Sequence, residues 1–424
     1  MSLWAAVRRV RTRRAAAVVL AVVVPLVVSA PAVPSGAAST TLDDGVTGQG
    51  AAAARRVVDV VVTGRGAPGS TRTFTGRVDG AATGSPVVVQ RRTETGWTAA
   101  VRGTTRAQGA FALEVRTARF GNAQYRVHAP AWRGLPAVSG RVRDVGAYGD
   151  LRTALAGPVR CLGAQALDPA LAPCDNPALD GTVTPDPRRA GWDQDNQGAY
   201  ACYTADPAQP VKSCAYGSRA KDALQVAVVG DSHGAMLLPG VKDVAARLNW
   251  RVHTYVARGC VLADPGPRED GCHARRSDLL TRLVAERYDV VIVTGYRNAS
   301  ARPEAMAAAW RRLQAVGSTV AVVADNPRLS ETVLACVTSA RTVAAAERCS
   351  MDRAAALAVP DDLVVAQRAT PGSILVDSTD LLCGPARCRP VVGHVMAYRD
   401  QHHLSATYSR TLTPYRLQAV VAGL

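Results

Sequence analysis

The chain of 424 residues has two halves that differ in the period of their apolar positions. Between residues 57 and 142, apolar and polar residues alternate in short runs that are separated by Gly-containing turns. A period of two is that of strands with one buried face, so this half predicts an all-β module. From residue 224 onward, short apolar runs alternate with longer helical segments. That order predicts an α/β domain, with a parallel sheet covered by helices on both faces.

The first half contains seven such runs, which together predict a small β-sandwich over residues 55–148. Its run Val87–Arg92, followed by Gly96-Trp97 and Gly109-Ala110-Phe111, resembles immunoglobulin-like accessory domains of surface proteins. No cluster of Ser, His and Asp lies in this half, so we expect a spacer or a binding module. The predicted strands are 57–62, 71–78, 86–91, 97–102, 111–116, 125–128 and 137–142.

The second half begins with a run of small and branched apolar residues, Val226–Val229, that fits an inner strand. Four more strands are expected at 251–257, 289–294, 319–324 and 373–377. Helices are expected at 233–248, 277–287, 303–316, 339–358, 361–369 and 405–421.

The N-terminus has the pattern of a targeting segment. Several arginines precede the apolar run 15–30, and small residues at 35–38 offer a cleavage site. Residues 1–40 therefore predict a signal peptide or an uncleaved N-terminal anchor, with 41–54 as a linker. Both alternatives place the rest of the chain outside the cytoplasm, and no later stretch is long and apolar enough to cross a bilayer.

The net charge of +16 comes almost entirely from arginine and is spread along the chain. Nucleic-acid binding would call for a clustered basic stripe and a binding motif, and the sequence shows neither.

Ten cysteines, all after residue 160, indicate disulfide bonds in an exported chain. The sequence leaves their connectivity open, but nearest neighbours bracket short loops, which favours local pairs. Because no Cys-x-x-Cys pair exists, we expect no metal site, and nothing indicates a cofactor. The cysteines are Cys161, Cys174, Cys202, Cys214, Cys260, Cys272, Cys336, Cys349, Cys383 and Cys388.

Residues 155–223, which contain the first four cysteines, are rich in Pro, Asp and Gly and have little periodicity. They predict a disulfide-rich cap that leads into the catalytic domain (224–424) and borders its cleft.

The candidate chemistry lies in two short motifs. Ser232 follows the first strand of the α/β half and precedes a helix, whose free N–H groups can stabilise an oxyanion. A serine at this position could also simply cap the helix. Near the other end of the chain, Asp400 precedes His403 by three residues, and the neighbouring His402 is the rival base. Serine, histidine and aspartate are the parts of a hydrolytic triad.

The motifs Gly230-Asp231-Ser232-His233 and Asp400-x-x-His403-Leu404 resemble the SGNH (GDSL-like) hydrolase superfamily. The likeness is closest to the SGNH domain fused to bacterial family 3 membrane acyltransferases, and it extends over about residues 155–424. It implies a three-layer α/β/α sandwich with a parallel sheet. It also implies that Ser232 is the nucleophile, His403 the base and Asp400 its orienting partner.

The resemblance departs from the pattern at the oxyanion hole, where typical members add a glycine and the asparagine of a Gly-x-Asn motif. Here the candidates are the Ser232 N–H, Gly259 after the second strand, and Asn298, which is one residue too distant for that motif. Three other carboxylates near strand ends, Asp325, Asp377 and Asp380, are interpreted as structural.

Together these features predict an extracytoplasmic serine esterase or O-acyltransferase. The resemblance implies that it acts on O-acyl, mainly O-acetyl, groups of cell-envelope glycans. A transferase would need a separate multi-spanning membrane acyltransferase as partner, and contact with the membrane would be limited to the N-terminal segment. The alternative is a catalytically inert surface scaffold or adhesion protein.

Overall fold

The computed structural model describes residues 55–64, 66–117, 119–194, 200–206, 209–265, 271–298 and 301–424. The predicted targeting segment and linker, residues 1–54, lie outside this part of the chain. Across the described ranges, we find no helix with the length and apolar character needed to cross a bilayer.

The N-terminal module consists of two antiparallel sheets, β1-β2-β5 and β4-β3-β6-β7, with β8 also paired to β6. Apolar side chains of both sheets, such as Phe74, Val89 and Val127, meet in one buried cluster. The period-two pattern therefore predicted six of the strands correctly, but within the run expected at 137–142 only Val138–Ser139 forms a strand, and the strand at Arg143–Ala147 was not expected. The immunoglobulin-like character of the module stays a prediction. The strands are β1 (Arg56–Gly64), β2 (Thr71–Asp79), β3 (Pro86–Thr93), β4 (Gly96–Thr104), β5 (Ala110–Arg116), β6 (Gly121–Ala129), β7 (Val138–Ser139) and β8 (Arg143–Ala147).

The second half contains a six-stranded sheet in the order β15-β13-β12-β10-β11-β9. Five strands run parallel, as expected. A sixth strand, β9, was not expected, and it pairs antiparallel with β11 at the edge. The short β9 joins the sheet through the register Arg251↔Gly217, which local pattern does not reveal. The strands are β9 (Cys214–Gly217), β10 (Leu224–Gly230), β11 (Trp250–Val256), β12 (Val290–Val293), β13 (Thr319–Val323) and β15 (Ile374–Val376).

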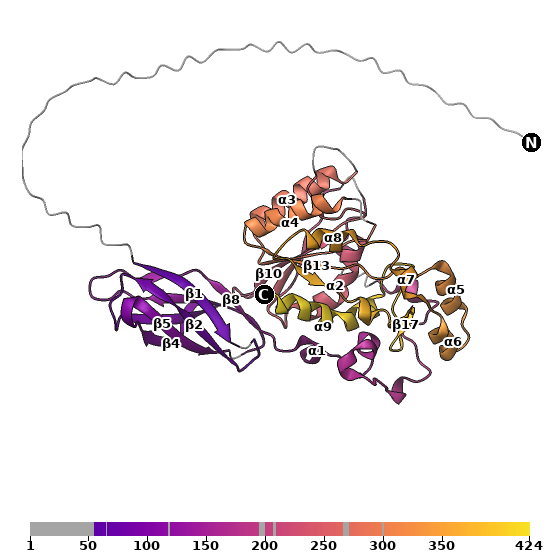
Figure 1. Cartoon of the computed structure of the whole chain (residues 1–424), viewed down its shortest axis with the longest axis horizontal. Coiled ribbons are helices and arrows are strands. Elements are labelled where there is room, and N and C mark those ends of the chain that lie inside the picture. The colour runs from indigo at the N-terminus through magenta and orange to yellow at the C-terminus, as the bar shows by residue number, and fades with distance from the viewer. Residues whose placement is uncertain are drawn as a thin grey trace, which may run out of the picture. The chain divides into compact units, whose positions relative to one another are not determined.

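Helices cover both faces of this sheet. Alternate residues of β10 pack against the helices of opposite faces. Val226 and Val228 pack in one cluster with α2 (Ser232–Ala245) and α9 (Ala406–Ala422). Ala227 and Val229 pack in the other, with α3 (His273–Glu286), α4 (Pro303–Ala315) and α8 (Asp362–Arg368). Figure 1 shows α3, α4 and α8 on one side of the sheet and α2 and α9 on the other. The continuous apolar runs of the strands reflect this burial on both faces.

The segment between β13 and β15 differs most from expectation. Helical pieces were expected over 339–358, and this range holds α6 (Val343–Arg348) and α7 (Arg353–Ala356) with β14 (Met351–Asp352) between them. The helix α5 (Glu331–Ser339), which precedes them, was not expected. Short strands β16 (Arg387–Cys388), β17 (Val391–Val392) and β18 (Val395–Met396) lie between β15 and α9.

Before the sheet, α1 (Leu151–Ala154) is followed by short 3₁₀ turns and loops, as expected for residues 155–223. All ten cysteines form disulfide bonds with their nearest neighbours, which confirms the local pairing. The pairs are Cys161–Cys174, Cys202–Cys214, Cys260–Cys272, Cys336–Cys349 and Cys383–Cys388.

Candidate active site

Ser232 occupies the first turn of α2, directly after β10. The cap of this helix is Asp231, whose Oδ1 accepts a hydrogen bond from the His233 N–H at 2.8 Å. The other oxygen of Asp231 accepts from the Tyr296 N–H at 2.9 Å, which ties the end of β12 to this turn. The interpretation of Ser232 as the helix cap is therefore wrong, and its hydroxyl is available for another partner.

That partner is His403, which lies on the loop before α9. Its Nε2 lies 2.8 Å from the Ser232 Oγ, and its Nδ1 lies 2.7 Å from Asp400 Oδ2. With Nδ1–H donating to the carboxylate, Nε2 can accept a hydrogen bond from the Ser232 hydroxyl. The structure thus brings together the three residues that the two motifs suggested, from positions 171 residues apart.

Asp400 is held by more than the imidazole. Its Oδ1 accepts hydrogen bonds from the N–H groups of His402 (3.0 Å) and His403 (2.8 Å). Burial alone would raise the pKa of Asp400, but the His403 side chain and these N–H groups hold that pKa well below its usual range. Asp400 therefore stays ionised and can stabilise a protonated His403.

The two other oxyanion candidates follow the neighbouring strands β11 and β12 at the same edge of the sheet. Gly259 follows β11 with φ +66° and is exposed, with room beside its Cα. Asn298 is also exposed, and within the described residues it makes no hydrogen bond to Ser232, Asp400 or His403. Arg297, which precedes Asn298, is buried, and its backbone N–H donates to Asp325. This contact anchors the loop after β12 to the end of β13.

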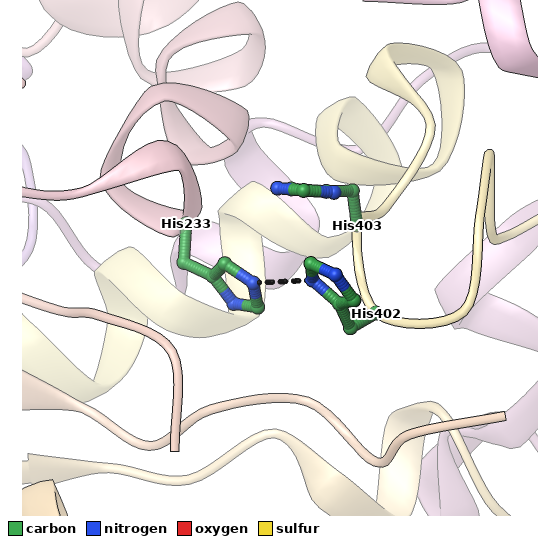
Figure 2. A group of neighbouring side chains, drawn as sticks. All are labelled: His233, His402 and His403. Carbon is green, nitrogen blue, oxygen red and sulfur yellow. Dashed lines mark hydrogen bonds between the residues drawn. The ribbon is translucent and has the colours of Figure 1, made fainter. Parts of the chain in front are cut away.

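A second Asp–His pair lies behind the first and was missed in the sequence analysis. His233 is fully buried, and its Nδ1 lies 2.5 Å from Asp325 Oδ1. Its Nε2 forms a 2.9 Å hydrogen bond with His402 Nδ1, and Figure 2 shows these two rings together with that of His403. His402 is held further by Asn326, whose side-chain amide donates to the His402 carbonyl at 2.5 Å. Asp325 is thus part of the site, and not only a turn residue.

The electrostatics of this pair differ from those of the triad. Burial would lower the pKa of His233, but the Asp325 carboxylate raises it above the usual value. Burial and the nearby His403 and His233 rings lower the pKa of His402 to about 4. His402 therefore stays neutral at pH 7, whereas His233 favours the charged form beside Asp325.

The disulfide-rich segment reaches the site through Tyr200. Its hydroxyl donates to the Ser232 carbonyl at 3.4 Å and accepts from the Arg399 guanidinium at 3.0 Å. Asp193, nearby in sequence, accepts from the N–H groups of Ala406 and Thr407 at the start of α9. These contacts place part of the disulfide-rich segment beside Ser232 and the start of α9.

The other two carboxylates singled out in the sequence follow β15. Asp377 accepts from the Thr379 N–H in a turn, and Asp380 is an exposed partner of Arg353. Both fit the structural interpretation.

A mostly parallel sheet between helical layers, with Ser, His and Asp hydrogen-bonded in series at its carboxyl edge, defines the class of α/β proteins built like serine hydrolases. Residues 201–417, just over half of the chain, match the family model described as "SGNH domain (fused to AT3 domains)". The chain belongs to this SGNH family.

Two solved structures show distant likeness. One is the periplasmic domain of a lipopolysaccharide acetyltransferase from Salmonella ser. Paratyphi A, at 12% identity and a TM-score of 0.38 over 47% of this chain and 84% of that one. The other is a β-D-glucuronidase from Dictyoglomus thermophilum, at 9% identity and a TM-score of 0.22 over 63% of this chain and 44% of that one. A sequence comparison with curated proteins finds no match.

Proposed function

We propose that this protein is an extracytoplasmic serine enzyme that removes or transfers O-acyl groups, mainly acetyl, on cell-envelope glycans. The observation that carries the proposal is the 2.8 Å hydrogen bond between Ser232 Oγ and His403 Nε2, with Asp400 on the far side of the ring. Membership in a family whose SGNH domains are fused to acyltransferase domains supports chemistry on acyl esters.

In the first step, His403 takes the Ser232 proton while Oγ attacks the ester carbonyl carbon. The tetrahedral intermediate collapses, the carbon–oxygen bond to the leaving sugar breaks, and His403 returns the proton to that sugar oxygen. The acyl group is now an ester of Ser232. Water or another sugar hydroxyl then attacks it with the same help from His403, which releases the free serine. General-base assistance of this kind contributes roughly 10²–10⁴-fold in rate.

The negative oxygen of the intermediate needs donors. We assign this role first to the Ser232 N–H, which is one of the free N–H groups at the start of α2. The N–H of Gly259 is the second candidate, because this glycine follows the neighbouring strand β11 and has open space beside it. Asn298 would have to turn inward from its exposed position to contribute.

The proposal also assigns the parts of the chain. Residues 1–40 would export or anchor the protein, and 41–54 would link them to the module at 55–148. Residues 155–223 would form a wall of the cleft, and 224–424 would carry catalysis. Five disulfide bonds are typical of proteins in oxidising compartments, which supports an extracytoplasmic site. In a transferase, a separate membrane acyltransferase would supply the acyl group.

A fluorophosphonate probe tests the nucleophile, because it forms a stable adduct only with an activated serine. We expect one adduct, on the peptide containing Ser232, and none after Ser232→Ala or His403→Ala. The chain offers a matched comparison in Ser139, an exposed serine whose Oγ lies 2.9 Å from His128 Nδ1. We expect no adduct there, because among the described residues no carboxylate forms a hydrogen bond or ion pair with His128. If folded protein shows no adduct on Ser232, the inert scaffold becomes the better explanation.

Esterase and transferase are separated by product analysis. Purified protein is incubated with an O-acetylated glycan, with and without an acceptor sugar. Free acetate in both reactions indicates an esterase. Acetylated acceptor in place of acetate indicates a transferase.

A further inference from the structure

Three imidazole rings converge beside the nucleophile, from the first turn of α2 and from the loop before α9 (Figure 2). Each of His233, His402 and His403 offers one ring nitrogen, and these nitrogens lie within 4.8 Å of one another. The proposed reaction uses only His403. The arrangement of the other two rings therefore calls for a separate explanation.

Two of the rings are oriented as in metal sites. The Nδ1 of His403 faces Asp400 at 2.7 Å, and the Nδ1 of His233 faces Asp325 at 2.5 Å. Metal-binding histidines almost always donate their second N–H to a carboxylate, a carbonyl or water, which fixes the ring and strengthens the free nitrogen as a ligand. Both Nε2 atoms here are left for other partners: His402 in one case and Ser232 in the other.

The third ring is that of His402, which offers its Nδ1. This nitrogen lies 2.9 Å from His233 Nε2, and a single proton lies between the two nitrogens. An ion bound by both rings would replace that proton. Zinc–imidazole bonds of about 2.0–2.1 Å at tetrahedral angles separate two ligand nitrogens by roughly 3.4 Å. The His233–His402 distance would thus have to widen by roughly half an ångström. His402 stands on a loop, so a small rotation can provide this.

The donor set selects the ion. Three neutral imidazoles suit Zn²⁺, whereas Mg²⁺ and Ca²⁺ require oxygen ligands. Three histidines with one position left for water or a hydroxyl form a common zinc coordination. The Ser232 Oγ lies 2.8 Å from the His403 Nε2.

We propose that His233, His402 and His403 form a Zn²⁺ site, and that zinc bound there switches the enzyme off. Binding forms three N–Zn bonds, displaces the proton between His233 and His402 to solvent, and breaks the Ser232–His403 hydrogen bond. His403 can then no longer accept the serine proton. The inhibitory part rests on the proposed function, whereas zinc binding itself does not.

The test is isothermal titration of ZnCl₂ into metal-free protein, with the wild type and three variants. We expect one ion per chain in the wild type and in Ser232→Ala, which keeps all three rings. His402→Ala should weaken binding at least tenfold, and His128→Ala, which removes a histidine of the β module, should leave it unchanged. Titration with Co²⁺ should give the visible absorption of a tetrahedral site in the same variants. His403→Ala serves as a second site variant if His402→Ala does not fold, as judged by circular dichroism.

Probe labelling is then measured in parallel. Zinc should slow labelling of Ser232 at least tenfold in the wild type, EDTA should restore it, and Mg²⁺ and Ca²⁺ should have no effect. The site is refuted if the wild type binds no zinc, or if His402→Ala and His403→Ala bind it as tightly as the wild type. Zinc binding with no labelling of metal-free protein would instead refute the proposed function and leave the site intact.

Discussion

The most informative single change is Asp400→Asn, because it alters one oxygen and keeps the shape of the side chain. In the wild type, Asp400 Oδ2 accepts the His403 Nδ1–H at 2.7 Å, and Oδ1 accepts two backbone N–H groups. An asparagine can keep its Oδ1 on the backbone, but it then presents an NH₂ donor to the ring. His403 would have to accept at Nδ1 and carry its proton on Nε2, where it can no longer take the proton of Ser232.

The expected loss of activity depends on how far the side chains of Asp400 and His403 are exposed to water. A fully buried triad aspartate changed to asparagine lowers kcat by about 10⁴-fold. The side chain of Asp400 is 45% exposed, while that of His403 is 14% exposed, so water can replace part of the lost stabilisation of the imidazolium. We therefore expect kcat to fall by about 10²–10³-fold, which corresponds to roughly 3–4 kcal/mol of transition-state stabilisation.

The assay is hydrolysis of p-nitrophenyl acetate, together with the rate of labelling by the fluorophosphonate probe. Both should fall together, while the far-ultraviolet circular dichroism and the melting temperature stay close to those of the wild type. The matched control is Asp380→Asn. This change removes an exposed carboxylate outside the triad that forms a 2.6 Å ion pair with Arg353. Folded Asp400→Asn protein that keeps its rate to within about threefold would show that Asp400 does not orient the base.

Three further outcomes are expected. First, His403→Ala should abolish ester turnover, whereas His402→Ala should lower it by no more than about tenfold in zinc-free buffer; the opposite ranking, measured with the same ester, would exchange their roles. Second, Asp325→Asn removes a charge that faces buried His233, and breaking such a pair costs about 3–5 kcal/mol of unfolding free energy, measured by urea denaturation; a loss below about 1 kcal/mol would contradict this. Third, burial, followed by the charge of Asp144, raises the pKa of Asp289 to about 6. The folded state then binds the proton more readily than the unfolded state, so this group's contribution to stability falls as pH rises from about 4 to 6. Because Asp289 is partly exposed, we expect the stability of Asp289→Asn relative to the wild type to increase by only about 1 kcal/mol between pH 4 and pH 7. An unchanged difference between these two pH values would count against that assignment.

Much of the α/β half could be predicted because its signals are local. The strands are apolar runs buried on both faces, and Asp400 and His403 are close enough in sequence for one loop to join them. The edge strand β9 was missed, since four residues are too few to show a period and its pairing with β11 is set by the tertiary fold. The contact of His233 with Asp325 joins residues 92 positions apart, and no spacing rule in a single sequence reports such a contact.

Residue type alone could not decide which histidine is the better candidate for the base, because the described residues include two Asp–His pairs of similar geometry. The two Asp–His pairs differ in how deeply their side chains are buried. The side chains of His233 and Asp325 are 0% and 1% exposed, so this pair cannot reach a substrate. His403 and Asp400 lie nearer the surface, where a proton can move between Ser232, the ring and a leaving alcohol. The buried pair still contributes to the geometry of the site, because His233 contacts His402 on the loop that carries His403. Ser232 and His403 are therefore held together by residues that follow β13, Asp325 and Asn326, as well as by their own hydrogen bond.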